Sequence, residues 1–185
     1  MPGNLIYVSG PSGSGKDSLL RYAREQLSVH AGICFAHRYI TRAADAGGEN
    51  HVALSEEEFA ARSHEDLFAL DWASNGLRYG IGAEIDLWLD KGLTVVMNGS
   101  REYLPQARMR YPHIVPVGIT VPESMLRERL LARGRESVEH VEQRLTRNRS
   151  LEHLSGQAEI IRNDGDLDLA GQALTSLILR YAGRA

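Results

Sequence analysis

Cysteine, net charge and long hydrophobic runs are all scarce in this sequence of 185 residues, and each shortage excludes a class of protein. The single cysteine, Cys34, cannot form a disulfide within the chain, and its apolar neighbours favour a place in the core. No hydrophobic run is long enough to span a bilayer, and the first residues lack the pattern of a signal peptide. A net charge of −3 provides no overall basic field for nucleic acid. We therefore expect a cytoplasmic protein that binds a small anion, with no membrane and no nucleic acid as partner.

What the sequence does contain is an alternation of short apolar segments with longer amphipathic ones. The apolar segments, expected as strands, are residues 4–9, 33–36, 93–97, 114–121 and 159–162. The amphipathic segments, expected as helices, are residues 19–27, 83–91, 101–111, 123–133 and 167–181. In a chain of one-domain length, this alternation predicts an α/β fold in which a five-stranded parallel sheet lies between helices.

Residues 38–82 interrupt the alternation, because they are rich in glycine and polar residues. One short helix is expected there, opened by Ser55 and Glu58 as a capping box. We interpret this region as an insertion that binds a substrate.

Between the first expected strand and the first helix lies a segment that fits the pattern G-x-x-x-x-G-K. Glycines at this spacing allow consecutive backbone N–H groups to converge on phosphate oxygens, and the lysine reaches the β- and γ-phosphates of a nucleotide. The segment predicts an ATP site in which Lys16 is catalytic. Its nucleotide-binding residues are Gly10, Pro11, Ser12, Gly13, Ser14, Gly15 and Lys16.

Asp17 stands where this pattern usually has a serine or threonine that binds magnesium. A carboxylate is also a good ligand for magnesium, and a negative charge is favourable in the first turn of a helix. Asp17 and Ser18 are therefore the candidate metal ligands, and both are expected to contact the nucleotide. The alternative is that Asp17 only begins the helix.

Several segments across most of the chain resemble the guanylate kinase family of nucleoside monophosphate kinases. Ile40-Thr41-Arg42 is similar to the T-T-R segment of that family, His51 falls on the tyrosine of its G-x-x-Y segment, and Arg78-Tyr79-Gly80 is similar to its Y-Y-G segment. The resemblance implies an acceptor-phosphate site made by Arg38, Arg42, His51 and Tyr79. Arginine suits this role because its guanidinium binds oxyanions through two parallel hydrogen bonds. His51 is equally well explained as a structural residue.

The chain departs from that family where the family reads guanine. Leu70 and Ile81 replace an acidic and a hydroxyl residue, and Asn98-Gly99-Ser100 replaces an Asp-x-Asp segment. A guanine against two apolar side chains would leave hydrogen-bonding groups unpaired, at a cost of about 1 to 3 kcal/mol each. GMP is therefore not the expected acceptor.

Seven arginines lie between residues 127 and 149, interleaved with glutamates, which by itself is typical of a solvated helix surface. Gly134 breaks this pattern at a segment similar to the turn that begins the mobile lid of the guanylate kinase family. The resemblance implies that Arg133 and Arg144 neutralise charge on the transferred phosphoryl group and that Arg135 binds the nucleotide. It also places Asn163 in the loop on the adenine side.

A further set of motifs resembles the ribose 1,5-bisphosphate phosphokinase family of bacterial phosphonate breakdown, which shares the aspartate after the P-loop lysine. These motifs are G-P-S-G-S-G-K-D, R-Y-I-T-R, G-G-E-N-H, N-G-x-x-Y-G and V-x-N-G-S-R, and the last adds Asn98 and Arg101 to the expected substrate-binding residues. The resemblance implies that ATP and magnesium are used to phosphorylate ribose 1,5-bisphosphate to 5-phospho-α-D-ribose 1-diphosphate, with release of ADP.

The resemblances together divide the chain as a P-loop kinase. The expected core is residues 1–37, 83–126 and 155–185, the acceptor-binding insertion is 38–82, and the lid region is 127–154. Two alternatives stay open: a nucleoside monophosphate kinase with altered base choice, and a guanylate kinase-like module without catalysis. The intact P-loop argues against the second, because a scaffold has no use for Lys16. The oligomeric state also stays open, with a homodimer as one option.

Overall fold

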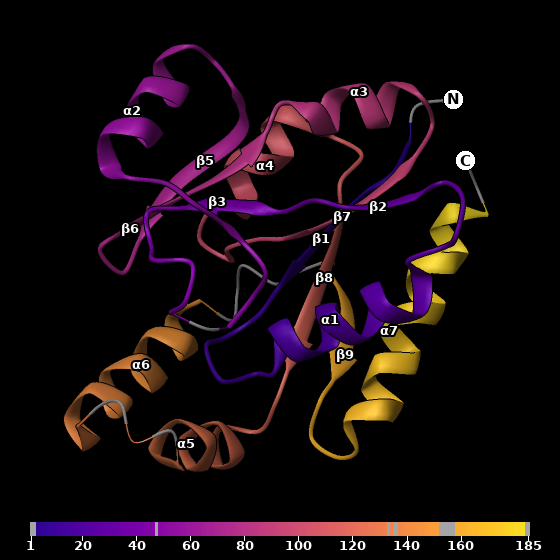
Figure 1. The fold of residues 1–185 in the computed structure, drawn as a ribbon. Helices are drawn as coiled ribbons and strands as arrows, with labels where there is room; N and C mark the ends of the chain where they lie inside the picture. Colours follow the sequence, from indigo (N-terminus) through magenta and orange to yellow (C-terminus); the bar gives the residue numbers. More distant parts are fainter. Residues whose placement is uncertain (1–2, 47, 133, 135–136, 152–157, 184–185) are drawn as a thin grey trace.

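The computed structural model describes residues 3–46, 48–132, 134, 137–151 and 158–183. Its main sheet has five strands, all parallel, in the order β2-β7-β1-β8-β9 (Figure 1). The strands are β1 (Leu5–Ser9), β2 (Ile33–Phe35), β7 (Thr94–Asn98), β8 (Val115–Thr120) and β9 (Glu159–Arg162). The expected α/β fold with a five-stranded parallel sheet is confirmed.

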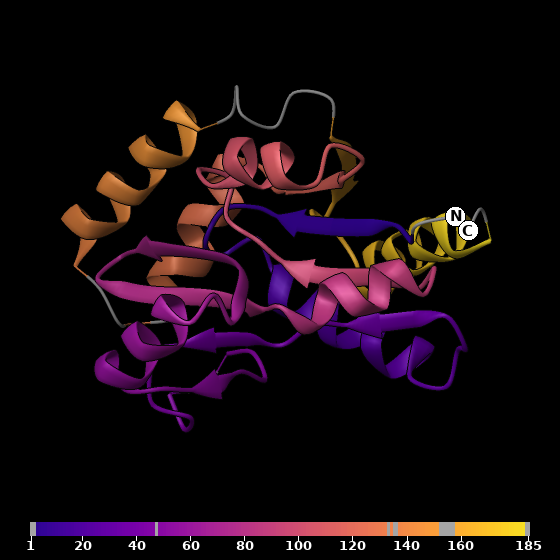
Figure 2. The same cartoon turned by 90° about the horizontal axis from the view of Figure 1, so that it is seen from above.

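The central strand β1 has apolar side chains on both faces, as a strand between two helical layers must. Ile6 and Val8 pack in one core with helices α1 (Lys16–Leu27) and α7 (Leu167–Ala182). Leu5 and Tyr7 pack in a second core with helices α3 (Glu84–Asp90) and α4 (Leu104–Arg110). Figures 1 and 2 show the sheet between these two pairs of helices.

Residues 38–82 form a second, four-stranded sheet, in the order β4-β3-β6-β5, beside the expected short helix. Its elements are β3 (Arg38–Ile40), β4 (Val52–Ala53), α2 (Glu56–His64), β5 (Phe68–Ser74) and β6 (Leu77–Gly82). Ser55 caps α2 by accepting a hydrogen bond from the backbone N–H of Glu58. The sequence analysis missed the four strands, although Asn75-Gly76, both with positive φ, is a typical hairpin turn between β5 and β6.

Helices α5 (Glu123–Ala132) and α6 (Val138–Ser150) lie in the expected lid region, although α5 begins before its first residue, 127. The two helices pack on each other through a small core of their own. Leu126 and Leu130 of α5 meet Val141 and Leu145 of α6 there. Figure 1 shows the pair beyond the N-terminal end of α1. Within the described ranges, no helix is both long enough and apolar enough to cross a membrane.

The structure differs from the sequence-based expectation, or does not test it, at four of the residues named above. Helix α4 begins at Leu104, three residues after the expected start, so that Arg101 lies in the loop after β7. The expected site residues Arg133 and Arg135 lie outside the described residues. Cys34, expected in the core, is only half-buried in the edge strand β2.

Candidate active site

The glycine-rich segment forms the loop between β1 and α1, and its shape depends on glycine at two positions. Gly13 and Gly15 have φ values of +89° and +80°, which side chains with a Cβ rarely adopt. A Cβ at Gly15 would also collide with the side-chain amide of Asn163. That amide donates a hydrogen bond of 2.7 Å to the backbone oxygen of Ser14. Asn163, expected on the adenine side, therefore fixes the loop from outside.

A hollow of about 400 Å³ opens on this outer side of the loop. Ser18 and Asn163 line it together with Gly13 and Gly15. Arg129 of α5 also lines it and donates a hydrogen bond of 3.0 Å to the backbone oxygen of Asn163. The sequence analysis did not single out Arg129, because one arginine in an arginine-rich helix carries no distinguishing signal.

A separate cleft of about 230 Å³ lies on the inner side of the loop. It collects expected residues from five parts of the chain: the P-loop, β3, β6, the loop after β7, and α6. These residues are Gly10, Ser12, Lys16, Asp17, Arg38, Tyr79, Arg101 and Arg144. Arg144 reaches the loop directly, since its Nη1 donates to Ser12 Oγ at 2.9 Å.

Lys16 and Asp17 form an ion pair at the end of the cleft, with 3.1 Å between Lys16 Nζ and Asp17 Oδ1. Burial lowers the pKa of Lys16, and the charge of Asp17 opposes this effect. Burial alone would raise the pKa of Asp17, but the charge and hydrogen bond of Lys16, together with the charge of Arg38 and the hydrogen bond from Asn98, lower the pKa overall. Asp17 is thus held as a carboxylate. Ser18, the other candidate metal ligand, lines the outer hollow instead.

Asn98 connects Asp17 to a second carboxylate, Glu49. Its Nδ2 donates to Asp17 Oδ1 at 3.1 Å and to Glu49 Oε2 at 3.3 Å. Glu49 in turn accepts two hydrogen bonds from Arg38, one of them 2.7 Å from Nε, and lies 3.9 Å from Arg42 Nη2. Lys16, Asp17, Asn98, Glu49 and Arg38 form one continuous polar network. The sequence analysis missed Glu49, although its place in G-G-E-N-H between the expected arginines and His51 was a usable signal.

Arg42 and His51 lie together but do not line the cleft. His51 Nε2 is 3.1 Å from the backbone oxygen of Arg42, and His51 Nδ1 is 3.1 Å from that of Glu49. Arg42 Nη2 also lies 3.3 Å from His51 Nδ1. His51 thus connects the backbone at Arg42 with the backbone at Glu49 and stabilises the segment between them.

Arg38 ends a stack of aromatic side chains along one wall of the cleft. Its guanidinium lies 4.9 Å from the ring centre of Tyr79, and Tyr79 stacks on Trp72 at 5.6 Å. Trp72 stacks in turn on Tyr103 at 5.3 Å. Leu70 and Ile81 pair in register between β5 and β6 and are fully buried, so neither presents a surface that could read a base.

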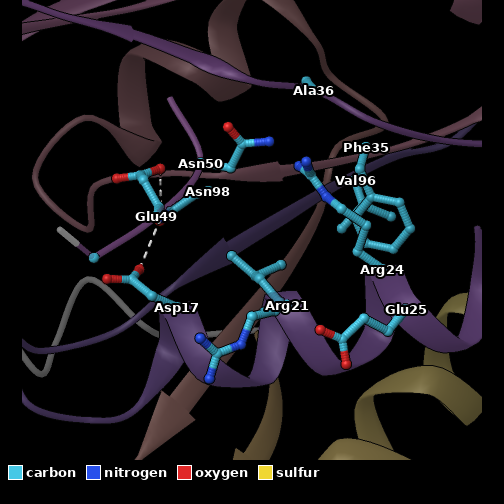
Figure 3. Close-up of a pocket in the computed structure, with 12 residues that line it drawn as sticks. Asp17, Arg21, Arg24, Glu25, Phe35, Ala36, Glu49, Asn50, Val96 and Asn98 are labelled. Atoms are coloured by element: carbon cyan, nitrogen blue, oxygen red, sulfur yellow. Dashed lines mark hydrogen bonds between the residues drawn. The ribbon is translucent and has the colours of Figure 1, made fainter. Parts of the chain in front are cut away.

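A second hollow of about 230 Å³ lies behind Asp17, between α1 and the segment of Glu49 (Figure 3). Arg24 of α1 lies over the ring of Phe35 at 5.5 Å, with its Nη1 2.8 Å from His37 Nε2. Asp17, Glu49 and Asn98 also line this hollow, so it shares its polar edge with the network of the cleft.

No family model matches the chain. The chain is 56% identical to the ribose 1,5-bisphosphate phosphokinase PhnN of Thiobacillus denitrificans over 176 residues, covering 95% of this chain and 93% of that protein. It is also 56% identical to the protein of the same name from Desulfomicrobium baculatum over 177 residues, covering 95% and 94%. Among solved structures, guanylate kinase from Anaplasma phagocytophilum matches with a TM-score of 0.68 and 18% identity, covering 97% of this chain and 86% of that one.

Proposed function

Since the chain belongs to the ribose 1,5-bisphosphate phosphokinase family, we propose that it transfers the terminal phosphoryl group of ATP to ribose 1,5-bisphosphate. The products are 5-phospho-α-D-ribose 1-diphosphate and ADP. The observation that carries the proposal is the inner cleft, where a P-loop lysine faces Arg38 and Tyr79 of the inserted sheet. We assign the donor phosphates to the P-loop side of this space and the acceptor phosphate to the side of the inserted sheet.

The donor side is the P-loop with its outer hollow. Backbone N–H groups of the loop and the N-terminal end of α1 bind the phosphates of ATP. The base is assigned to the side of Asn163, whose amide already shapes the loop through Ser14. Ser18, which lines this hollow, is assigned to the nucleotide and not to the metal.

Magnesium fits the donor set of the inner cleft. The described residues hold no group of three acidic, histidine or cysteine side chains that could bind a metal by themselves. Magnesium in phosphoryl-transfer sites usually takes only one or two carboxylates and otherwise phosphates and water, and the ionised Asp17 meets this need. When bound, the ion would neutralise charge on the β- and γ-phosphates.

The acceptor atom is a phosphate oxygen, which is already ionised at neutral pH, so the reaction needs no side-chain base. The task of the protein is to align two anionic groups and offset their repulsion. Lys16 holds the γ-phosphate, while Arg38 and Tyr79 hold the acceptor phosphate in line with it. Arg144 closes the cleft over the P-loop through Ser12. Arg133 and Arg135 keep their expected lid roles as part of the proposal.

Glu49 has a positioning role. Its two hydrogen bonds hold the guanidinium of Arg38 against the ring of Tyr79, which fixes the plane of the guanidinium before the acceptor arrives. Arg42 lies near the carboxylate of Glu49, and His51 contacts its backbone oxygen, so both help to keep Glu49 in place.

A coupled assay of ADP release tests the proposal, with ribose 1,5-bisphosphate, GMP, AMP and dCMP as acceptors. We expect kcat/KM for ribose 1,5-bisphosphate to exceed the other values by at least about a hundredfold, because a nucleobase finds no partner near Leu70 and Ile81. Phosphorus NMR of the product should show a new diphosphate. Lys16→Met, which removes the charge but retains the aliphatic stem, should abolish turnover while circular dichroism stays that of the wild type. A folded Lys16→Met protein with near-normal turnover, or a nucleotide as the best acceptor, would overturn the assignment.

A further inference from the structure

The inner cleft continues beyond the P-loop end toward α6 and the loop after β7. Lys16, Arg38 and Tyr79 lie at one end. The continuation is lined by Ser100, Arg101, Glu102, Arg147 and Asn148. Of its positive charges, Arg101 is an expected substrate-binding residue with no group of the substrate assigned to it, and Arg147 has no role so far.

Arg101 is held there by the main sheet. The hydroxyl of Tyr7 in β1 donates to the backbone oxygen of Ser100 at 2.7 Å and accepts from its N–H at 2.9 Å. Tyr7 itself is fully buried. A Cβ at Gly99 would collide with the ring of Tyr7, so the loop packs directly on that ring. The backbone that carries Arg101 is therefore fixed before any ligand binds.

Helix α6 meets Arg101 through Asn148. Arg101 Nη2 donates to Asn148 Oδ1 at 2.7 Å, and Arg101 Nη1 donates to the backbone oxygen of Asn148 at 3.4 Å. The side-chain nitrogen of Asn148 is buried and has no acceptor within the described part of the chain. A buried donor without a partner costs about 1 to 3 kcal/mol, so an oxygen that reached this nitrogen would be bound favourably.

The side chain of Arg147 holds this part of α6 in place. Arg147 binds the carboxylate of Glu102 through two hydrogen bonds of 2.6 and 3.2 Å. Its third nitrogen donates to Asn75 Oδ1, at the hairpin of the inserted sheet, at 2.7 Å. Arg147 thus joins the lid, the loop after β7 and the insertion around the far part of the cleft.

We propose that Arg101 and Asn148 form the subsite for the second phosphate of the acceptor, with Arg147 as the residue that positions α6 over it. The inference rests on the proposed function, which requires an acceptor with two phosphate groups on one sugar. One phosphate must lie in line with the γ-phosphate beside Lys16 and Arg38, so the other must lie farther along the cleft. A guanidinium and an amide N–H are suitable donors for such a phosphomonoester. The lid helix then recognises the acceptor, and a nucleoside monophosphate lacks the group that it binds.

Two sugar monophosphates can distinguish binding at the two ends of the cleft, because each carries only one of the two phosphates of the acceptor. Ribose 5-phosphate carries only the second phosphate, and ribose 1-phosphate carries only the one that accepts the phosphoryl group. Each is measured as a competitive inhibitor against ribose 1,5-bisphosphate at saturating ATP. We expect Arg101→Gln to raise the inhibition constant of ribose 5-phosphate about ten- to a hundredfold and that of ribose 1-phosphate less than threefold. The KM for ATP should stay within about twofold.

Asn148→Asp tests the subsite from α6 without removing volume. The added negative charge should raise the inhibition constant of ribose 5-phosphate at least tenfold, again with little effect on that of ribose 1-phosphate. Arg149→Ala is the matched control on the same helix, because Arg149 pairs with Glu123 and does not line the cleft. It should leave both inhibition constants unchanged.

Two results would overturn the subsite. One is an equal loss for both monophosphates in Arg101→Gln, which would place Arg101 at the transferred phosphoryl group. The other is no inhibition of the wild type by ribose 5-phosphate at millimolar concentration. Failure of the proposed function itself looks different, because wild-type protein would then not phosphorylate ribose 1,5-bisphosphate at all.

Discussion

Asp17 is the residue at which this P-loop departs from the general pattern, and its surroundings define what the departure does. The carboxylate pairs with Lys16 and accepts from the amide of Asn98. An extra negative charge beside a triphosphate is tolerable only when cations offset it, and Lys16 does so in the absence of ligand. Under the proposed function, Lys16 would turn to the γ-phosphate when ATP binds, and a divalent ion would take its place beside Asp17. A serine at this position would make no such demand.

Substitution of Asp17 should therefore change the magnesium requirement more than the affinity for nucleotide. We expect Asp17→Asn to raise the magnesium concentration for half-maximal activity about tenfold, because a charged ligand becomes a neutral one. Asp17→Ser restores the usual hydroxyl and should retain much of the activity. Initial rates over a magnesium titration at fixed ATP measure both. The same half-maximal concentration in wild type and both variants would show that Asp17 only begins helix α1.

At the scale of elements, the loop after β7 depends on β1, a strand about 90 residues earlier in the chain, through the hydroxyl of Tyr7. Burial raises the pKa of Tyr7, so the phenol stays protonated and keeps donating to Ser100 through the neutral range. In the unfolded chain, Tyr7 ionises with the ordinary tyrosine pKa of about 10. This contribution to stability is accordingly present below pH 10 and is lost as the pH rises above it.

Removal of the hydroxyl in Tyr7→Phe should cost about 1 to 3 kcal/mol of unfolding free energy at pH 7, because the N–H and oxygen of Ser100 lose their partner. Urea denaturation measures this cost, and the difference from wild type should shrink as the pH rises above about 10. The KM for ribose 1,5-bisphosphate should rise severalfold with little change for ATP, since the loosened loop carries Arg101 and not the nucleotide site. Equal effects on both substrates would show that Tyr7 supports the P-loop instead.

The elements of this molecule differ in how well the sequence predicts them. The main sheet and the P-loop were predictable because their signals are local: apolar runs, and glycines that accept positive φ. In the second sheet, β3 and β4 are only three and two residues long, and β3 pairs with β6 far along the chain, so no local pattern indicates them. β5 and β6 are longer and are joined by the Asn75-Gly76 turn, a local signal that was there to be used. The site divides in the same way. Lys16 and Arg38 follow from motifs, whereas the role of Glu49 depends on Arg38 of β3 and Asn98 of β7, which only the fold brings together beside it.

For the whole molecule, the relation between the two sheets decides whether the insertion is a separate unit. One core cluster contains side chains from both: Tyr7 and Met97 of the main sheet, and Leu70, Trp72 and Ile81 of the inserted one. Apolar burial of this kind stabilises only when both parts are in place. The insertion and the core should therefore unfold together, and acceptor binding to one should stabilise both.

The two tryptophans allow this to be tested, because each reports on a different part. Trp72 lies in β5 of the insertion and Trp88 in α3, and both pack against the shared core cluster. In Trp88→Phe the remaining fluorescence follows the insertion, and in Trp72→Phe it follows the main domain. We expect the urea midpoint from fluorescence to equal that from circular dichroism within each variant, as a two-state transition requires. If the fluorescence of Trp72 changed at lower urea than the circular dichroism of the same variant, the insertion would be an independent unit, and the shared core cluster would contribute too little to couple it to the P-loop.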